Sequence, residues 1–220
     1  TTEIYTLSLH DALPIYVSTD FPRRNPTGKH FLRFEHQDIE APGEGTPQIL
    51  LWNSYNGTYS LKMQTGFYRF ICSNGLVLGR TIDASRVRHT GEPAKSWLST
   101  VAAALRDVDC ALPRVQQMRE REMREVEILE FGARAVALRF RTDLSDPTIP
   151  VMPSAVAATM VRRREDEGND LWRVFNRVQE NLLHGGFHSP RSGRRTIHLN
   201  PRAKVEFNSR LFQEVAVSYL

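Results

Sequence analysis

Basic residues are concentrated in one short segment near the end of the chain, where they could hold phosphates. Five of the fourteen residues from 191 to 204 are basic, and only Glu206 stands nearby in opposition. They are Arg191, Arg194, Arg195, Arg202 and Lys204. Arginine presents a planar, permanently charged fork of donors that suits phosphate oxygens. Gly185 and Gly186 precede the segment and would allow close backbone approach. The pattern predicts a phosphate-binding loop, with an ordinary exposed basic loop as the alternative.

A second set of cations follows predicted strands. Arg69 lies between two aromatic residues, and Arg86, Arg88 and His89 come after the next turn. Arg86 and Arg88 alternate, so both would project from the same face of a strand. Arginines interleaved with aromatic side chains bind single-stranded nucleic acid by neutralising phosphates and stacking bases. The alternative is that the aromatic side chains form the core of the sheet.

The segment from Leu171 to Leu183 has the spacing of an amphipathic helix. The face opposite its apolar stripe carries Arg173, Asn176, Arg177, Glu180 and His184. Asn176 and Gln179 lie three residues apart near the boundary between the two faces, and their amides can bind a base edge or a phosphate. We therefore add both to the predicted nucleic-acid-binding residues. The alternative is that they hold the basic loop that follows the double glycine.

Catalytic and cofactor motifs are weak or missing in the sequence. It contains no GxxxxGK[ST], GxGxxG or HExxH pattern, and its only cysteines, Cys72 and Cys110, have no CxxC spacing. Cys72 with His89 could form a thiolate pair, but nothing marks an activated nucleophile. We predict no cofactor, no metal and no catalytic residue, and an enzymatic activity is not favoured.

The composition indicates a globular protein. Of 220 residues, 40% are hydrophobic, and the net charge is only +4 although 25 arginines stand beside four lysines. A source with GC-rich codons would produce the same arginine bias. No apolar run approaches the roughly 18 residues that span a membrane, so we expect no membrane partner. The two cysteines predict no disulfide framework, and we expect a cytoplasmic location.

The elements that would position these residues predict an α+β fold. We expect an antiparallel sheet over about residues 30–90, backed by a C-terminal set of α-helices. The predicted strands are 30–36, 48–52, 58–64, 66–72 and 76–78, with an Asn56-Gly57 turn. The predicted helices are 94–105, 114–129, 133–141, 154–167, 171–183 and 209–219. Asn169 or Asp170 would cap the helix at 171–183, and the double glycine would end it.

The first residues, TTEIYTLSLHDALPI, resemble a translated sequencing adapter and lack the features of a signal peptide. We expect residues 1–15 to be non-native and residues 16–220 to form a single domain whose natural N-terminus is missing.

Two blocks of sequence resemble a phage- and plasmid-like family, the domain of unknown function DUF932. The first block, residues 52–79 followed by VRHTGE, contains the SxxG turn, the GxxRxxCSNGL segment and the RHTG segment of that family. The second, DLWRVFNRVQENLLHGG followed by FNSRLFQEVA, matches its LWxxxNxxQENxxxGG segment and its closing segment, with Phe212 where tryptophan is usual. The resemblance covers about residues 31–220.

The resemblance implies a protein of mobile elements without an established activity. The architecture predicted for this chain is similar to that of phage single-strand annealing proteins of the RecT and Red-beta kind. Those proteins hold DNA in a basic groove without ATP. We therefore predict nucleic-acid binding, with single-stranded DNA favoured, in replication or recombination, and self-association if the protein anneals strands. The alternatives are a protein-binding accessory or anti-defence factor, whose interface would be the charged helix at 114–130, and a metal-dependent enzyme acting on nucleic acid.

Overall fold

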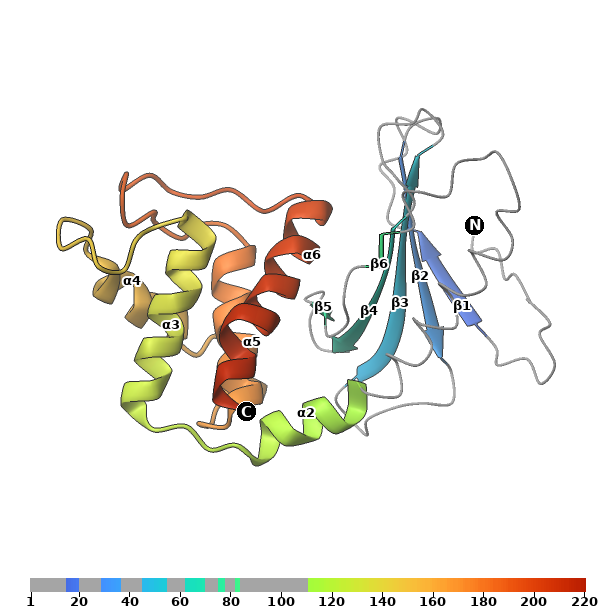
Figure 1. Ribbon diagram of the computed structural model, residues 1–220, viewed down its shortest axis with the longest axis horizontal. Coiled ribbons are helices and arrows are strands. Elements are labelled where there is room, and N and C mark those ends of the chain that lie inside the picture. The colour runs from blue at the N-terminus through green and yellow to red at the C-terminus, as the bar shows by residue number, and fades with distance from the viewer. Residues whose placement is uncertain are drawn as a thin grey trace. The chain divides into compact units, whose positions relative to one another are not determined.

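The computed structural model describes six strands between residues 15 and 83 and the continuous segment from residue 111 to residue 220 (Figure 1). The chain divides into two compact units, Thr1–Pro113 and Arg114–Leu220, which are described separately below. The predicted single domain at 16–220 stays a prediction, as does the adapter origin of residues 1–15. The predicted helix at 94–105 and the Asn56-Gly57 turn lie outside the described residues.

The described part of the first unit consists of strands that pair antiparallel with their neighbours. The strands are β1 (Ile15–Thr19), β2 (Lys29–His36), β3 (Gly45–Ser54), β4 (Lys62–Arg69), β5 (Gly75–Val77) and β6 (Ile82–Asp83). They follow the order β1-β2-β3-β4-β5, and β6 also pairs with β4. In the central pair, Leu51 stands opposite Leu32 on one side and Met63 on the other. Leu50, Leu51 and Phe67 are buried.

Strand β4 corrects one predicted boundary. The sequence analysis placed a break between a strand at 58–64 and another at 66–72, at Thr65. Instead, β4 runs through this point, because its pairing with β3 continues from Met63 opposite Leu51 to Gly66 opposite Gln48. Glycine in its interior ordinarily weakens a strand. Here the pairing with β3 continues through Gly66, so β4 is not interrupted.

The second unit is helical, which confirms the prediction of a C-terminal set of helices. Its elements are α2 (Ala111–Glu120), α3 (Glu125–Phe140), α4 (Val151–Thr159), the short 3₁₀ turn η1 (Arg164–Asp166), α5 (Leu171–Leu183) and α6 (Pro201–Arg210). A π-helical turn, η2 (Leu211–Val215), and a 3₁₀ turn, η3 (Ala216–Tyr219), continue α6 to the end of the chain. Helices α3 and α5 lie between α4 and α6 (Figure 1).

Helix α5 begins and ends where the sequence predicts. The Asp170 side chain accepts a hydrogen bond from the Arg173 amide at 3.0 Å, which satisfies one of the unpaired donors of the first turn. After Leu183, Gly185 and Gly186 adopt φ values of 75° and 77°, which residues with a Cβ rarely adopt. Local capping chemistry therefore sets both ends of this helix.

The predicted single helix at 114–129 is wrong, because residues 121–124 are extended and separate α2 from α3. This segment pairs with the residues just before α5: the Met123 amide donates to the Asn169 carbonyl, and the Leu171 amide donates to the Arg121 carbonyl, both at 2.8 Å. At Arg124, helix α3 starts afresh, and the Glu127 carboxylate accepts a hydrogen bond from the Arg124 amide at 2.8 Å. The separate helix predicted at 133–141 is the second half of α3.

Two other predicted helices have wrong bounds. The helix predicted at 154–167 is α4, which starts at Val151 and ends at Thr159. The helix predicted to start at residue 209 starts at Pro201, where the Asn200 side chain accepts a hydrogen bond from the Ala203 amide at 2.9 Å. Proline at the first helical position fits this start, because its missing N–H has no partner there in any helix.

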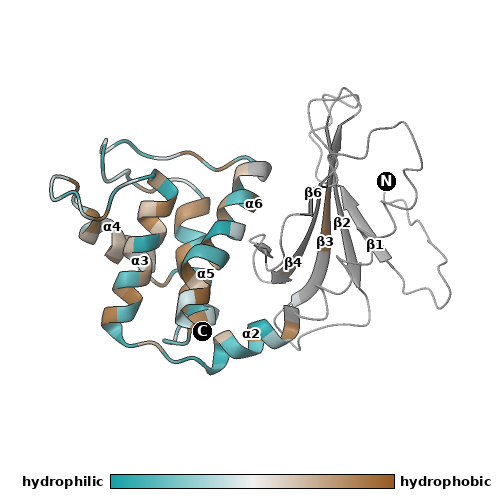
Figure 2. Cartoon of the chain, in the orientation of Figure 1, coloured by the Kyte–Doolittle hydropathy of each residue, from teal (hydrophilic) through white to brown (hydrophobic). Residues whose placement is uncertain are grey.

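Helices α3 and α4 approach each other closely at Gly132. A Cβ at this position would lie 2.7 Å from Thr159 Cγ2 and 2.9 Å from the Ala155 carbonyl oxygen. Ala155 and Ala158 are fully buried, so α4 presents small side chains to α3. In Figure 2, α3 carries both hydrophobic residues, drawn in brown, and hydrophilic residues, drawn in teal.

We expect Gly132→Ala to destabilise the protein. Helix propensity alone would favour alanine by about 1 kcal/mol, but the clash with the α4 backbone costs about 1–3 kcal/mol and should outweigh it. Urea unfolding followed by circular dichroism measures the difference in the free energy of unfolding. A more stable variant would show that the two helices can separate at no cost.

Candidate nucleic-acid interface

The predicted basic loop is a hydrogen-bonded hairpin, residues 186–197, called the basic hairpin below. The Gly186 amide donates to the Thr196 carbonyl at 2.9 Å, and the Thr196 amide donates to the Phe187 carbonyl at 2.7 Å. Near its tip, the Ser189 amide donates to the Arg194 carbonyl at 3.0 Å. His188 and Arg195 form an isolated antiparallel bridge. The sequence predicted a loop here, and the structure adds that its backbone is held in one conformation.

The basic hairpin is anchored to the helices by an aromatic side chain and a glycine. Phe187 is 6% exposed, and its ring stacks on Phe140 at the end of α3, with 5.9 Å between the ring centroids. At the base of the hairpin, a Cβ on Gly185 would lie 2.8 Å from the His198 backbone nitrogen. The two arms can therefore meet only if residue 185 is glycine.

Arg191, Arg194 and Arg195 all lie on this hairpin with exposed side chains. Within residues 111–220, no acidic side chain forms an ion pair with any of the three. Asp146 lies within electrostatic reach of Arg191. The structure thus gathers three of the predicted residues on one exposed, cationic element.

Asn176 and Gln179 lie in the interior and not on this surface. Their residues are 2% and 0% exposed, and the Asn176 Nδ2 donates to the Trp172 carbonyl of the same helix at 2.6 Å. Side chains at these positions cannot reach a nucleic acid while the helices stay packed. The polar face predicted for α5 is only partly at the surface: Asn176 and Arg177 are buried, and Arg173, Glu180 and His184 are partly exposed.

A group of charged side chains at the base of the hairpin surrounds Glu180. Its Oε1 accepts a hydrogen bond from Arg163 Nη2 at 3.0 Å, and its Oε2 lies 3.5 Å from His184 Nε2. The His184 and His198 rings meet edge to face, 5.4 Å apart. Burial lowers the pKa of His184, and Lys204, His198 and Arg163 lower it further against the opposing effect of Glu180.

Two polar residues of α5 that the sequence analysis did not select organise the interior. Asn181 is fully buried, and its Nδ2 donates to the Ala158 and Met160 carbonyls at 2.8 and 2.9 Å, which satisfies the end of α4. Arg177 is also buried; burial lowers the pKa of its guanidinium, and the Asp166 and Asp170 carboxylates oppose this shift. Their signal in the sequence was the excess of amides and charges in a helix whose other face is strongly apolar.

The remaining predicted residues belong to the first unit. Arg69 is the last residue of β4, and only the backbone of this residue is described. Arg86, Arg88 and His89 lie outside the described residues, as do Cys72 and Cys110. That Arg69, Arg86, Arg88 and His89 bind nucleic acid stays a prediction.

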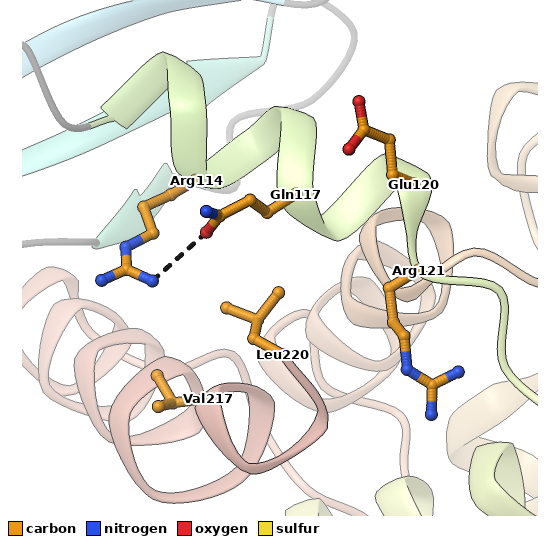
Figure 3. Close-up of a pocket in the computed structure, with 6 residues that line it drawn as sticks. All are labelled: Arg114, Gln117, Glu120, Arg121, Val217 and Leu220. Carbon is orange, nitrogen blue, oxygen red and sulfur yellow. Dashed lines mark hydrogen bonds between the residues drawn. The ribbon is translucent and has the colours of Figure 1, made fainter.

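A shallow cavity of about 540 Å³ lies between α2 and the end of the chain (Figure 3). Its lining combines four polar residues of the α2 side with two apolar ones, namely Arg114, Gln117, Glu120, Arg121, Val217 and Leu220. Arg121 is already bound, because its Nη2 donates to Glu127 at 2.8 Å and its Nε to the Tyr219 carbonyl at 3.1 Å. The cavity therefore offers a mixed surface without a convergent set of reactive groups.

Among the residues that the structure describes, no cluster of three or more His, Cys, Asp or Glu side chains could hold a metal ion. No helix in this part of the chain has both the length and the apolar character needed to cross a bilayer.

Comparison with known proteins identifies relatives along most of the chain. The model of the family described as Domain of unknown function (DUF932) matches residues 23–206. The UPF0380 protein YfjQ of Escherichia coli K12 is 34% identical over 168 residues, which are 75% of this chain and 58% of that protein. The UPF0380 protein YafZ of the same strain is 32% identical over 165 residues, with the same coverage. The chain thus aligns with little more than half the length of these relatives. No solved structure shows significant similarity.

We expect Gly185→Ala to destabilise the protein more than Gly193→Ala. Both glycines have positive φ, at 75° and 65°, so each variant should lose about 1–2 kcal/mol from backbone strain. Only at residue 185 would the new Cβ also meet backbone atoms, whereas nothing lies within 4 Å of it at residue 193. Equal losses in the free energy of unfolding would contradict a tightly closed hairpin base.

We expect His184 to make the protein less stable as the pH falls below about 6.5. Because the folded state lowers the pKa of His184, the unfolded state binds a proton first on acidification, and the free energy of unfolding decreases. His184→Gln should therefore lose less stability than the parent between pH 7 and pH 5. The exposed His188→Gln serves as the control and should follow the parent. Parallel curves for all three proteins would contradict the burial of His184.

Proposed function

The chain belongs to the DUF932 family, and we propose that its basic hairpin binds the phosphate backbone of nucleic acid, with single-stranded DNA as the favoured ligand. The observation that supports this most directly is the hairpin itself. It presents Arg191, Arg194 and Arg195 to solvent, without ion-paired carboxylates among residues 111–220. Guanidinium groups suit phosphate oxygens and stay charged at any relevant pH.

Fixed presentation adds to this argument. Ordering flexible arginine side chains and their backbone on binding costs free energy, and a preformed backbone lowers that cost. The hydrogen bonds between the arms and the Phe187–Phe140 stack hold the hairpin in place before any ligand arrives. The cost of ordering the hairpin then offsets less of the free energy gained from the contacts with phosphate.

The preference for single strands rests on the side chains beside the arginines. His188 is exposed and stands opposite Arg195 in the hairpin, and Ile197 is 84% exposed. A flat imidazole and an apolar side chain next to phosphate-binding cations can contact bases that are not stacked in a duplex. Phosphates are the same at every nucleotide, so arginines that contact them would bind without regard to base sequence.

The wider role extends the proposal to the whole protein. We place it in replication or recombination of a mobile element, acting without ATP in the cytoplasm, with annealing of single strands by self-associated copies as the most specific form. The finer α+β architecture, in which the helices back the antiparallel sheet, belongs to the same proposal. Arg69, Arg86, Arg88 and His89 belong to the same proposal, as further residues that contact the nucleic acid.

We expect the Arg194→Ala, Arg195→Ala double variant to bind a labelled single-stranded oligonucleotide more weakly than the parent. Fluorescence anisotropy over a range of salt concentrations measures this. The logarithm of affinity against the logarithm of salt should lose about 1.4 units of slope, because each phosphate contact to a single strand contributes about 0.7.

A matched control removes the same charge elsewhere. Arg114→Ala with Arg124→Ala deletes one exposed arginine of α2 and the arginine that precedes α3. The hairpin packs on Phe140 at the other end of α3, roughly 24 Å from Arg124 for a helix of 16 residues. Equal loss in both double variants would indicate a response to net charge alone. Absence of binding by the folded parent at low salt would overturn the proposal and favour the protein-binding alternative. Cleavage of the oligonucleotide on addition of Mg²⁺ would favour an enzyme.

A further inference from the structure

Helix α4 lies in a stretch of fifteen residues without a charge, from Pro147 to Val161. A helix at the surface of a soluble protein ordinarily carries charged residues on its outer face, and a helix that is apolar all round is ordinarily buried. Figure 2 shows α4 without the strong teal that marks α2. One side of the helix packs on α3 and α5, with Ala155 and Ala158 fully buried. The other side of α4 is unusual because it is exposed and yet carries no charged residue.

The outer side of α4 exposes a stripe of large apolar side chains, called the α4 stripe below. Met152, Val156 and Met160 are 54%, 50% and 60% exposed and recur every four residues along one face. Contiguous exposed apolar groups of this kind usually mark a contact surface rather than open solvent. Methionine is common in such contacts, because its flexible side chain adapts to the partner.

We propose that the α4 stripe pairs antiparallel with the α4 stripe of a second copy of this chain, about a twofold axis at Val156. The stripe is symmetric about its centre, with a methionine four residues before Val156 and another four residues after it. Antiparallel pairing therefore brings Met152 of each copy against Met160 of the other, and the two valines together. A twofold interface requires this kind of self-complementarity.

The charges at the two ends of the uncharged stretch suit the same arrangement. Asp146 precedes it, and Arg162, which is exposed, follows it. The Thr148 side chain and amide donate to the Asp146 carboxylate and lower its pKa, so the carboxylate is ionised at neutral pH. In an antiparallel pair centred on Val156, Arg162 of one copy falls opposite residue 150 of the other, and the turn from Asp146 to Ile149 lies immediately before that residue. Opposite charges therefore come near each other at both ends. Arg191 offsets part of the Asp146 charge, so these ends favour the antiparallel direction more than they add affinity.

The size of the stripe limits how tight the dimer can be. Stable dimers bury about 800 Å² on each partner, and three half-exposed side chains on one short helix supply only a fraction of that area. We therefore expect a weak dimer that forms as the concentration rises. This inference does not depend on nucleic-acid binding, and its failure would leave the basic hairpin untouched.

We expect Val156→Arg to abolish the dimer. Sedimentation velocity of the full chain from about 10 µM to about 1 mM should show the parent rising above its monomer mass of 25.2 kDa, while the variant stays there. In the dimer, the two new arginines would face each other at the axis. Val126→Arg, at another valine that is 73% exposed, is the matched control and should behave like the parent. A monomeric parent at every concentration, or a variant that still dimerises, would overturn the proposal.

Charge reversal tests the antiparallel direction. Asp146→Arg alone and Arg162→Asp alone each place like charges at both ends, so each should weaken the dimer. Mixed together, the two variants should recover a heterodimer, because opposite charges then meet at both ends. Circular dichroism confirms that both are folded. If the mixture associates no better than either variant alone, the antiparallel pairing is wrong.

Discussion

The second unit depends on the burial of α5, in which every residue except Arg173 and Glu180 is buried. Leu171, Trp172 and Phe175 fill one side of it at 0–1% exposure, and the amides of Asn176 and Asn181 are buried on the other. A buried amide without hydrogen bonds costs several kcal/mol, so such a helix is stable only if its neighbours supply partners. The end of α4 supplies the partners of the Asn181 Nδ2, whereas the Asn176 Nδ2 donates to the Trp172 carbonyl within α5 itself.

Three features of the unit can be traced to that constraint. Asn181 satisfies the last carbonyls of α4 and so sets where that helix ends. Glu180 holds Arg163 and His184 together at the base of the basic hairpin. The residues that precede α5 pair with 121–124 and separate α2 from α3. Gln179 and Asn181 of α5 are fully buried, although the residue type of Gln179 predicted a binding residue.

The surface of the unit divides into two regions of opposite character. The basic hairpin gathers exposed arginines on a rigid backbone, and the α4 stripe exposes apolar side chains on an uncharged helix. They approach each other where Asp146, before α4, comes within electrostatic reach of Arg191. A weak contact between copies beside a cationic element would suit a protein that lines up along a strand, because many weak contacts then act together.

The sequence by itself determined what local chemistry controls. The Asp170 cap, the double glycine and the apolar spacing of α5 each act within a few residues, and so the helix was predicted with correct bounds. The exposed basic loop followed from its glycines and charges. Family membership also followed from motifs that stand in the sequence itself. These features need no knowledge of what packs against them.

Only the tertiary structure decided the rest, because the deciding contacts join residues far apart in the chain. An unbroken helical pattern at 114–129 is interrupted by hydrogen bonds to residues near 170. Asn176 and Gln179 have the residue types of a binding surface, but helices on both sides of α5 bury them. The Arg163–Glu180 pair spans seventeen residues, and the α4 stripe is visible as a surface only once α3 and α5 have covered its other side. Periodicity shows that a helix has faces, but which faces meet solvent depends on packing that the local sequence does not encode.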